Sequence, residues 1–177
     1  MIAVTYSGML APAPPVRPLI AIDAETGEIV VPDREPAAVR TWIMNLTHTM
    51  LAMPGEKREF HVEHTIKDGM YMRKLFIPKG SLIIGKVHKL DCLNIVAQGD
   101  ISVLTETGSA RLRAGFTVAS PAGIQKVGYA HEDTIFINVF RTDETDVDRI
   151  EDVVAWESYE AAGYLTIEGE KQCLLHG

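Results

Sequence analysis

Two lysines, a histidine and a cysteine carry much of the chemistry that this sequence offers. In the first of two glycine-framed segments, Gly80 is followed by five residues, Lys86, one residue, His88, three residues and Cys92, and Gly99 comes after six more. An ammonium group favours a carboxylate or a phosphate. An imidazole and a thiolate are metal-ligand types, but two such ligands are too few for a closed zinc site.

The second segment has its own glycine frame and a further candidate charge. Gly115 is followed by five residues, Pro121, one residue, Gly123, two residues and Lys126, and Ala130 comes after three more. Fifteen residues separate the two segments. The proline and the glycine beside it predict a turn with a fixed bend.

Charge is distributed unevenly along the chain, whose formal net charge is −7. Between Tyr71 and Gly128 eight residues are basic and three are acidic, so this stretch carries +5 and the rest of the chain −12. From Thr142 to the end, ten residues are acidic and two are basic. A basic middle within an acidic chain favours an anionic partner for the middle. An uneven solvated surface is the alternative explanation.

The elements that must position these residues are short strands. Between residues 60 and 141 the sequence consists of brief apolar runs broken by glycine or proline. The expected strands are Phe60–Thr65, Met70–Ile77, Ser81–Val87, Leu93–Gln98, Ile101–Glu106, Ala110–Ala114, Phe116–Ser120 and Thr134–Arg141. About eight strands at this spacing predict an all-β sandwich or barrel, and no helical period supports a βαβ fold.

The flanking regions differ from this pattern. Four prolines among the first 18 residues predict an extended arm, and the turn Asp23–Gly27 allows a small hairpin between 19–22 and 28–31. Val39, Trp42 and Ile43 begin an apolar helical stripe, and Asp146 is the expected N-cap of an acidic helix. The predicted organisation is an arm (1–36), an amphipathic helix (37–54), a β-barrel (58–142), and an acidic C-terminal helix with a tail (143–177).

The two glycine-framed segments resemble the two motifs of the cupin superfamily, over roughly Tyr71 to Arg141. The resemblance implies a mainly β, cupin-type barrel or jelly roll. In cupins, three histidines and one glutamate usually hold a divalent metal, and here those positions read Lys86, His88, Cys92 and Lys126. The resemblance places them inside the barrel, where two ammonium groups oppose a divalent cation and favour an anion. We therefore expect neither a metal nor another cofactor.

Four neighbouring residues complete the expected ligand site. Arg73 is a candidate bidentate clamp for an anion. Tyr71 and Tyr129 are candidates to stack on a ligand ring, or else core aromatics with satisfied hydroxyls. Asn94 alternates along the same barrel wall.

Each motif residue also has a purely structural interpretation. Lys86 and Lys126 could extend from the barrel mouth into water. His88 could be a hydrogen-bonded core histidine, and Cys92 a small buried apolar residue. A fallback metal site would combine His88 and Cys92 with His64 or His61, for a divalent transition metal.

A narrower resemblance is to small cupin-like proteins of tailed bacteriophages and prophages. It is carried by the runs Gly69–Arg73, Gly85–Lys89 and Gly128–Thr134. In that pattern histidines occupy the positions of Cys92 and Phe140, so the metal expectation weakens further.

The function expected from these features is non-enzymatic binding of an anionic small molecule in the barrel. A nucleotide or signalling nucleotide is one candidate, and the phage resemblance would make the protein a sponge for a host immune signal. The first alternative is a metal-dependent cupin enzyme of the dioxygenase or isomerase type, and the second is a phage structural or assembly protein. The apolar helix favours a homo-oligomer, with a dimer as the first expectation.

Composition limits the classes of protein to which this chain can belong. The 177 residues are 46% hydrophobic and 23% charged, which is typical of one globular domain. The acidic balance argues against a nucleic-acid polymer as partner. No apolar run is long enough to span a membrane, and the first ten residues lack the basic start of a secretory signal. With only Cys92 and Cys173, a disulfide framework is excluded, so we expect a cytoplasmic protein, in the host cytoplasm if phage-encoded.

Overall fold

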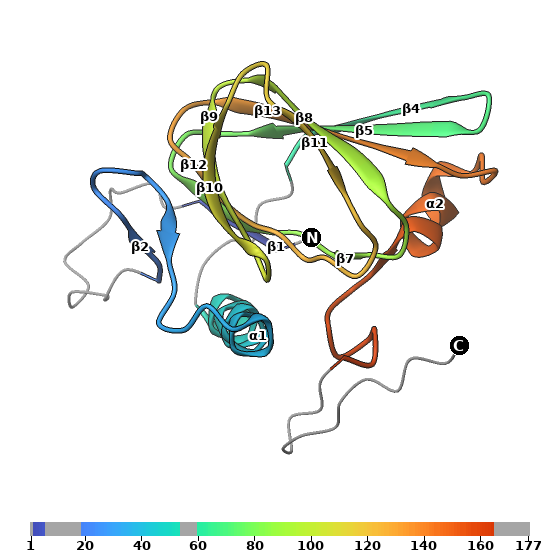
Figure 1. Ribbon diagram of the computed structural model, residues 1–177. Helices are drawn as coiled ribbons and strands as arrows, with labels where there is room; N and C mark the ends of the chain where they lie inside the picture. Colours follow the sequence, from blue (N-terminus) through green and yellow to red (C-terminus); the bar gives the residue numbers. More distant parts are fainter. Residues whose placement is uncertain (1, 6–18, 54–59, 165–177) are drawn as a thin grey trace.

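The computed structural model describes residues 2–5, 19–53 and 60–164 (Figure 1). The predictions for the prolines at positions 12–18 and for the tail from residue 165 to 177 lie outside these residues. Two five-stranded antiparallel sheets dominate the fold and curve around a common interior. Helices lie outside this barrel and at one of its ends.

The first sheet has the strand order β1-β6-β12-β9-β10, and the second has the order β11-β8-β13-β5-β4. The strands of the first are β1 (Ile2–Thr5), β6 (Ser81–Ile84), β12 (Val127–Ala130), β9 (Asp100–Thr105) and β10 (Gly108–Arg113). Those of the second are β11 (Thr117–Ser120), β8 (Cys92–Gln98), β13 (Thr134–Arg141), β5 (Met70–Ile77) and β4 (Val62–Lys67). Two strand pairs lie apart from these sheets: β2 (Ala21–Ile22) with β3 (Ile29–Val30), and β7 (Val87–His88) with β14 (Ala155–Trp156).

The strand order defines a jelly roll. Without the outermost β1 and β4, the two sheets are β6-β12-β9-β10 and β11-β8-β13-β5. The chain passes from sheet to sheet at most connections, and the strands β9 and β10 form a hairpin within one sheet. This is the eight-strand, double Greek-key arrangement that cupins share with other jelly rolls. The predicted mainly β, cupin-type fold is therefore confirmed.

Side-chain alternation fills the space between the sheets. Along β13, Phe136, Asn138 and Phe140 are buried while the residues between them are only partly so, as a strand with one face on a core requires. Phe136 belongs to an apolar cluster that draws on both sheets: Leu75, Ile77, Ile83, Val96, Ile101, Val103, Leu112, Ala130 and Phe136.

Strand β12 was not expected from the sequence, because Pro121, Gly123 and Gly128 weaken the strand pattern. Close packing of the adjacent strands β6 and β9 explains the glycine at position 128. A Cβ atom at Gly128 would lie 3.0 Å from a side-chain carbon of Ile83 and 3.1 Å from one of Ile101. Glycine there lets β12 lie between β6 and β9 without a clash.

Helix α1 (Pro36–Ala52) lies against the outer side of the first sheet (Figure 1). Glu35 precedes it without a side-chain cap, and Pro36 occupies its first turn. Its buried face packs on residues of β6, β9 and β12 and consists of Val39, Ile43, Leu46 and Met50. Burial of each such side chain contributes about 1.5–3 kcal/mol, so packing rather than capping stabilises this helix.

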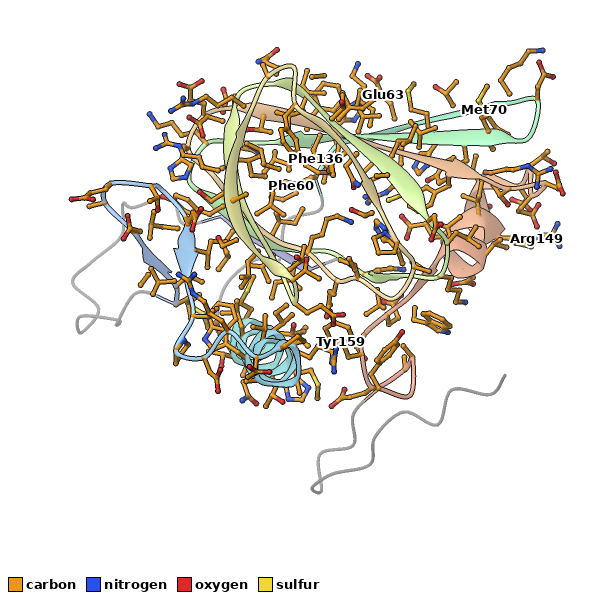
Figure 2. All side chains as sticks on the ribbon, in the orientation of Figure 1. Phe60, Glu63, Met70, Phe136, Arg149 and Tyr159 are labelled. Atoms are coloured by element: carbon orange, nitrogen blue, oxygen red, sulfur yellow. The ribbon has the colours of Figure 1, made fainter. Side chains whose placement is uncertain are left out.

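Tyr159 joins α1 to the barrel and is fully buried (Figure 2). Its hydroxyl accepts a hydrogen bond from the backbone N–H of Gln125 (3.2 Å) and donates one to Glu106 (3.3 Å). Arg40 of α1 forms an ion pair of 2.8 Å with the same carboxylate.

Helix α2 (Val147–Val154) packs at the end of the barrel next to β5 and β7 (Figure 1). Asp146 is its N-cap, since its carboxylate accepts a hydrogen bond from the Asp148 backbone N–H at 3.0 Å. Ile150 and Val154 are buried against a cluster that contains Tyr71, Cys92 and Phe140. Glu151 of the same helix reaches the barrel interior alongside Val154.

Candidate functional site

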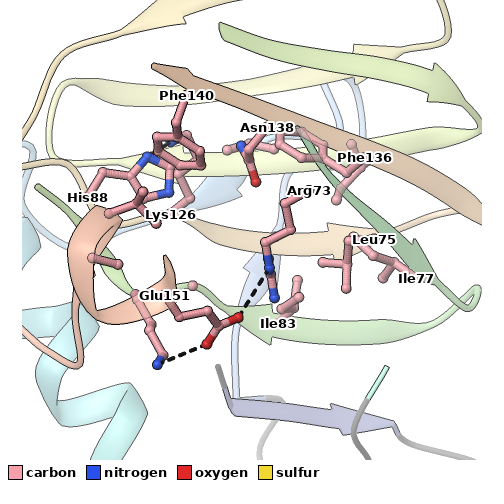
Figure 3. A pocket seen from close by; sticks show the side chains of 17 residues that line it. Arg73, Leu75, Ile77, Ile83, His88, Lys126, Phe136, Asn138, Phe140 and Glu151 are labelled. Carbon is pink, nitrogen blue, oxygen red and sulfur yellow. Dashed lines mark hydrogen bonds and ion pairs between the residues drawn. The ribbon is translucent and has the colours of Figure 1, made fainter. Parts of the chain in front are cut away.

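A pocket of about 90 Å³ lies between the two sheets and α2 (Figure 3). Its walls are mainly apolar and comprise Leu75, Ile77, Ile83, Ile101, Val103, Phe136, Phe140 and Val154 among others. Its polar side chains are Arg73, Lys86, His88, Lys126, Asn138 and Glu151. A few polar groups in an apolar cavity are the usual composition of a small-molecule site.

Four of the predicted site residues meet in this pocket although they are far apart in the sequence. Arg73 comes from β5 and His88 from β7, while Lys86 lies between β6 and β7. Lys126 directly precedes β12. Strand pairing brings them together, because β5 and β12 belong to the two facing sheets.

Glu151 is the carboxylate that faces these basic groups (Figure 3). Its Oε1 lies 3.4 Å from Arg73 Nε, and its Oε2 lies 3.1 Å from Lys86 Nζ. Lys86 also pairs with Glu157 at 2.5 Å. Burial opposes the charge on Glu151, but the hydrogen bond from Lys86 and the nearby cations hold the pKa of Glu151 below its usual value. Burial likewise opposes the charge on Lys86, yet its two carboxylate partners raise the pKa of Lys86.

Lys126 has a different environment. Its Nζ lies 3.4 Å from His88 Nδ1, and in the described ranges no carboxylate lies within ion-pair distance of it. Burial lowers the pKa of Lys126 below its usual value. The pocket therefore contains one amine whose charge is not balanced by an adjacent acid.

His88 is neutral in this environment. Burial, followed by the charges of Lys126 and Arg73, lowers the pKa of His88 to about 3. Its Nδ1 lies 3.1 Å from Cys92 Sγ, whose thiol donates to Asn94 Oδ1, and 3.4 Å from Lys126 Nζ. The ammonium of Lys126 can only donate, so beside it Nδ1 is the acceptor nitrogen and the ring proton lies on Nε2. The ring also meets Phe140 edge to face, with 5.0 Å between centroids.

Cys92 and Asn94 lie behind the pocket wall rather than in it. Cys92 is buried, and burial raises the pKa of its thiol, which favours the inert form. Asn94 donates to Ser120 Oγ at 2.8 Å and accepts from Asn138 Nδ2 at 2.8 Å. This buried network orients Asn138, which does line the pocket.

The two tyrosines do not lie where a ligand ring would stack. The hydroxyl of Tyr71 is 2.9 Å from His64 Nδ1, its ring stacks on Phe140, and burial raises the pKa of Tyr71 to about 12. Tyr129 packs instead with the cluster around α1, and its ring contacts His131. The core-aromatic interpretation describes Tyr71, and neither ring lines the pocket.

The fallback metal set is not assembled in the structure. His64 Nδ1 is engaged by the Tyr71 hydroxyl at 2.9 Å, and His61 is 3.6 Å from Glu63 near the surface. Within residues 2–5, 19–53 and 60–164, no group of three or more His, Cys, Asp or Glu side chains is placed to hold a metal ion.

Among the pocket residues that were not predicted, three matter most here: Asn138, Phe140 and Glu151. Asn138 and Phe140 lie at alternate positions of a predicted strand, so period-two alternation with the buried Phe136 carried a signal for them. Glu151 lies in the predicted acidic helix, and nothing local distinguishes it from its solvated acidic neighbours.

Fold and site together define a cupin-type jelly roll with a basic pocket in place of the usual metal ligands. No protein-family model and no curated protein matches the chain. Solved structures do match over about half of it. KdgF from Halomonas sp. is 19% identical, with a TM-score of 0.42, over 48% of this chain and 80% of that one. A cupin-2 domain protein from Shewanella frigidimarina is 12% identical, with a TM-score of 0.40, over 55% and 91%.

A conserved protein of unknown function from Streptococcus pyogenes is 20% identical, with a TM-score of 0.41, over 51% of this chain and 80% of that chain.

Among the helices of the described residues, none has the length and apolar character needed to cross a bilayer.

Proposed function

We propose that the barrel pocket binds a small anionic molecule, most simply a short carboxylate. One observation carries this proposal: three basic side chains, Arg73, Lys86 and Lys126, line an apolar pocket whose lining includes a single carboxylate, Glu151. The ammonium of Lys126 is the group that lacks an acidic neighbour in the described structure. A desolvated charge without a partner is costly, so an anion beside Lys126 relieves an existing penalty.

The pocket also suits the apolar part of a short carboxylate. Leu75, Ile83 and Phe136 are among the apolar walls that face the basic groups, so a short hydrocarbon chain can be buried while its carboxylate accepts charge-assisted hydrogen bonds. Asn138 and the Nε2–H of His88 add neutral polar groups at the same site.

The size of the cavity favours a small acid over a nucleotide. A volume of about 90 Å³ lies well below the roughly 300–1,000 Å³ of pockets that enclose drug-sized ligands. A complete nucleotide would have to leave most of its atoms outside. The signalling-nucleotide function, the phage origin, the cytoplasmic location and the homo-oligomer stay predictions, and the metal-dependent alternative gains no support from the donor set around His88.

Saturation-transfer NMR with propionate and with propionamide tests the proposal, since the two probes have the same shape and differ in charge. We expect saturable binding of propionate and at least about tenfold weaker binding of the amide, as loss of one charge-assisted contact implies. Lys126→Met should weaken propionate binding by a similar factor, and Lys67→Met, at an exposed lysine, should not. Equal binding of acid and amide would overturn the proposal.

A further inference from the structure

The amine of Lys126 occupies a position that other lysines of the described chain do not. It lies inside the apolar pocket, whereas Lys67 and Lys74 are near the surface and pair with carboxylates. Lys86 shares the pocket but is held between Glu151 and Glu157. Lys126 alone combines a pocket position with the absence of an acidic partner among these residues.

Burial without an adjacent acid also raises the fraction of uncharged amine at Lys126 above that of a surface lysine, while the ammonium remains the form that an anion selects. The titratable groups that act on it are His88 and Cys92, and neither supplies a negative charge while the thiol stays protonated. Glu151 lines the same pocket but is paired with Arg73 and Lys86. His88 Nδ1 accepts a hydrogen bond from Nζ at 3.4 Å and so helps to hold the nitrogen in place. A desolvated lysine with a fixed position is the arrangement from which amines attack carbonyl groups.

We propose that Lys126 forms a reversible imine with the carbonyl carbon of a small oxo-carboxylate bound in the pocket. This inference rests on the proposed function and specifies its ligand class. The carboxylate of such a ligand would bind Arg73 and Lys86 at the end of the pocket where Glu151 contacts them. Its carbonyl would face Lys126 across the pocket, and its short chain would contact the apolar wall.

The step is balanced without another reactant. Nζ of the neutral amine bonds to the carbonyl carbon, and the carbonyl oxygen becomes the hydroxyl of a carbinolamine. The C–O bond then breaks, the oxygen leaves as water with the two amine protons, and an imine remains. Addition of water reverses the sequence, so no oxidant or reductant is required and the protein is recovered.

Reductive trapping of the full-length chain tests this inference. The protein is incubated at neutral pH with pyruvate and sodium cyanoborohydride, and adducts are located by intact mass and peptide mapping. We expect one reduced adduct per chain, on Lys126, formed ahead of any on the exposed Lys67. Lys126→Arg should lose the adduct and Lys79→Arg, at an exposed position, should keep it. The peptide map of the unaltered chain gives the same answer if the variant does not fold.

Competition by propionate separates this inference from the proposed function. Propionate binds as an anion but has no carbonyl to attack, so it should slow the labelling of Lys126. If propionate binds and pyruvate labels only exposed lysines, the imine is wrong and anion binding stands. If labelling of Lys126 proceeds at the same rate with propionate present, the amine is reactive but the oxo-carboxylate site is wrong. If propionate does not bind and no adduct forms, both proposals fail.

Discussion

Acidification is expected to destabilise this protein through His88. Burial and two nearby cations lower the pKa of His88 in the folded chain to about 3, against 6.5 as the usual value. Between these two values the unfolded chain binds a proton that the folded chain does not. The free energy of unfolding therefore falls as the pH drops below about 6.5, and it continues to fall toward pH 3.

The magnitude follows from the size of this window. Each pH unit within it lowers the free energy of unfolding by about 1.4 kcal/mol, so acidification from pH 6.5 to 5.0 removes about 2 kcal/mol. Carboxylates with lowered pKa values, such as Glu151 and Asp100, lose their stabilising effect only nearer pH 4. The range from pH 6.5 to 5.0 therefore isolates histidine.

Urea denaturation of the unaltered protein and of His88→Gln at several pH values measures this effect. Glutamine can still accept a hydrogen bond from Lys126 but cannot titrate. Since burial also lowers the pKa of His131, that residue contributes equally to both proteins, and only the difference between their slopes reports His88. We expect the variant to lose about 2 kcal/mol less than the unaltered chain. Parallel slopes would refute a buried, neutral His88.

The remaining predictions concern ion pairing, backbone strain and the buried network. Glu151→Gln should cost about 1–2 kcal/mol of stability through its lost ion pairs, a modest loss because the side chain is 37% exposed. The change should also strengthen propionate binding in the NMR titration, because it removes the negative charge that competes for Arg73 and Lys86. Weaker binding would contradict the charge argument. Gly99→Ala should destabilise the fold in thermal denaturation far more than Gly80→Ala, since both have positive φ but only a Cβ at Gly99 would lie 2.4 Å from a backbone oxygen; equal losses would contradict this. Asn94→Ala should cost about 1–3 kcal/mol in urea by leaving Asn138 unpaired, and a neutral result would show that the network is dispensable.

Much of the fold was predictable because its determinants are local. Short apolar runs and the breakers between them mark most strands, and the spacing from Gly80 to Gly99 fixes the turns at which two of them end. The helix stripe from Val39 to Met50 likewise follows from a repeat that is visible in the sequence. Strand β12 was missed because its glycine is explained by neighbours from distant parts of the chain.

The site was predictable only in part, for a related reason. Tyr71 and Arg73 lie on the same face of β5, and alternation alone does not say which end of the barrel is filled and which is hollow. The packing of Ile150 of α2 on Tyr71 and Cys92 decides this, and it is a long-range contact. The same contact brings Glu151 into the pocket, where it pairs with Arg73 and Lys86.

A crystal structure of the protein soaked with pyruvate tests the central claim most directly, because it locates the anion. We expect density for the ligand between the two sheets, with its carbonyl carbon at Lys126, its carboxylate toward Arg73 and Lys86, and its methyl group against the apolar wall. A barrel that stays without ligand at saturating pyruvate, or a ligand found only on the outer surface, would contradict it.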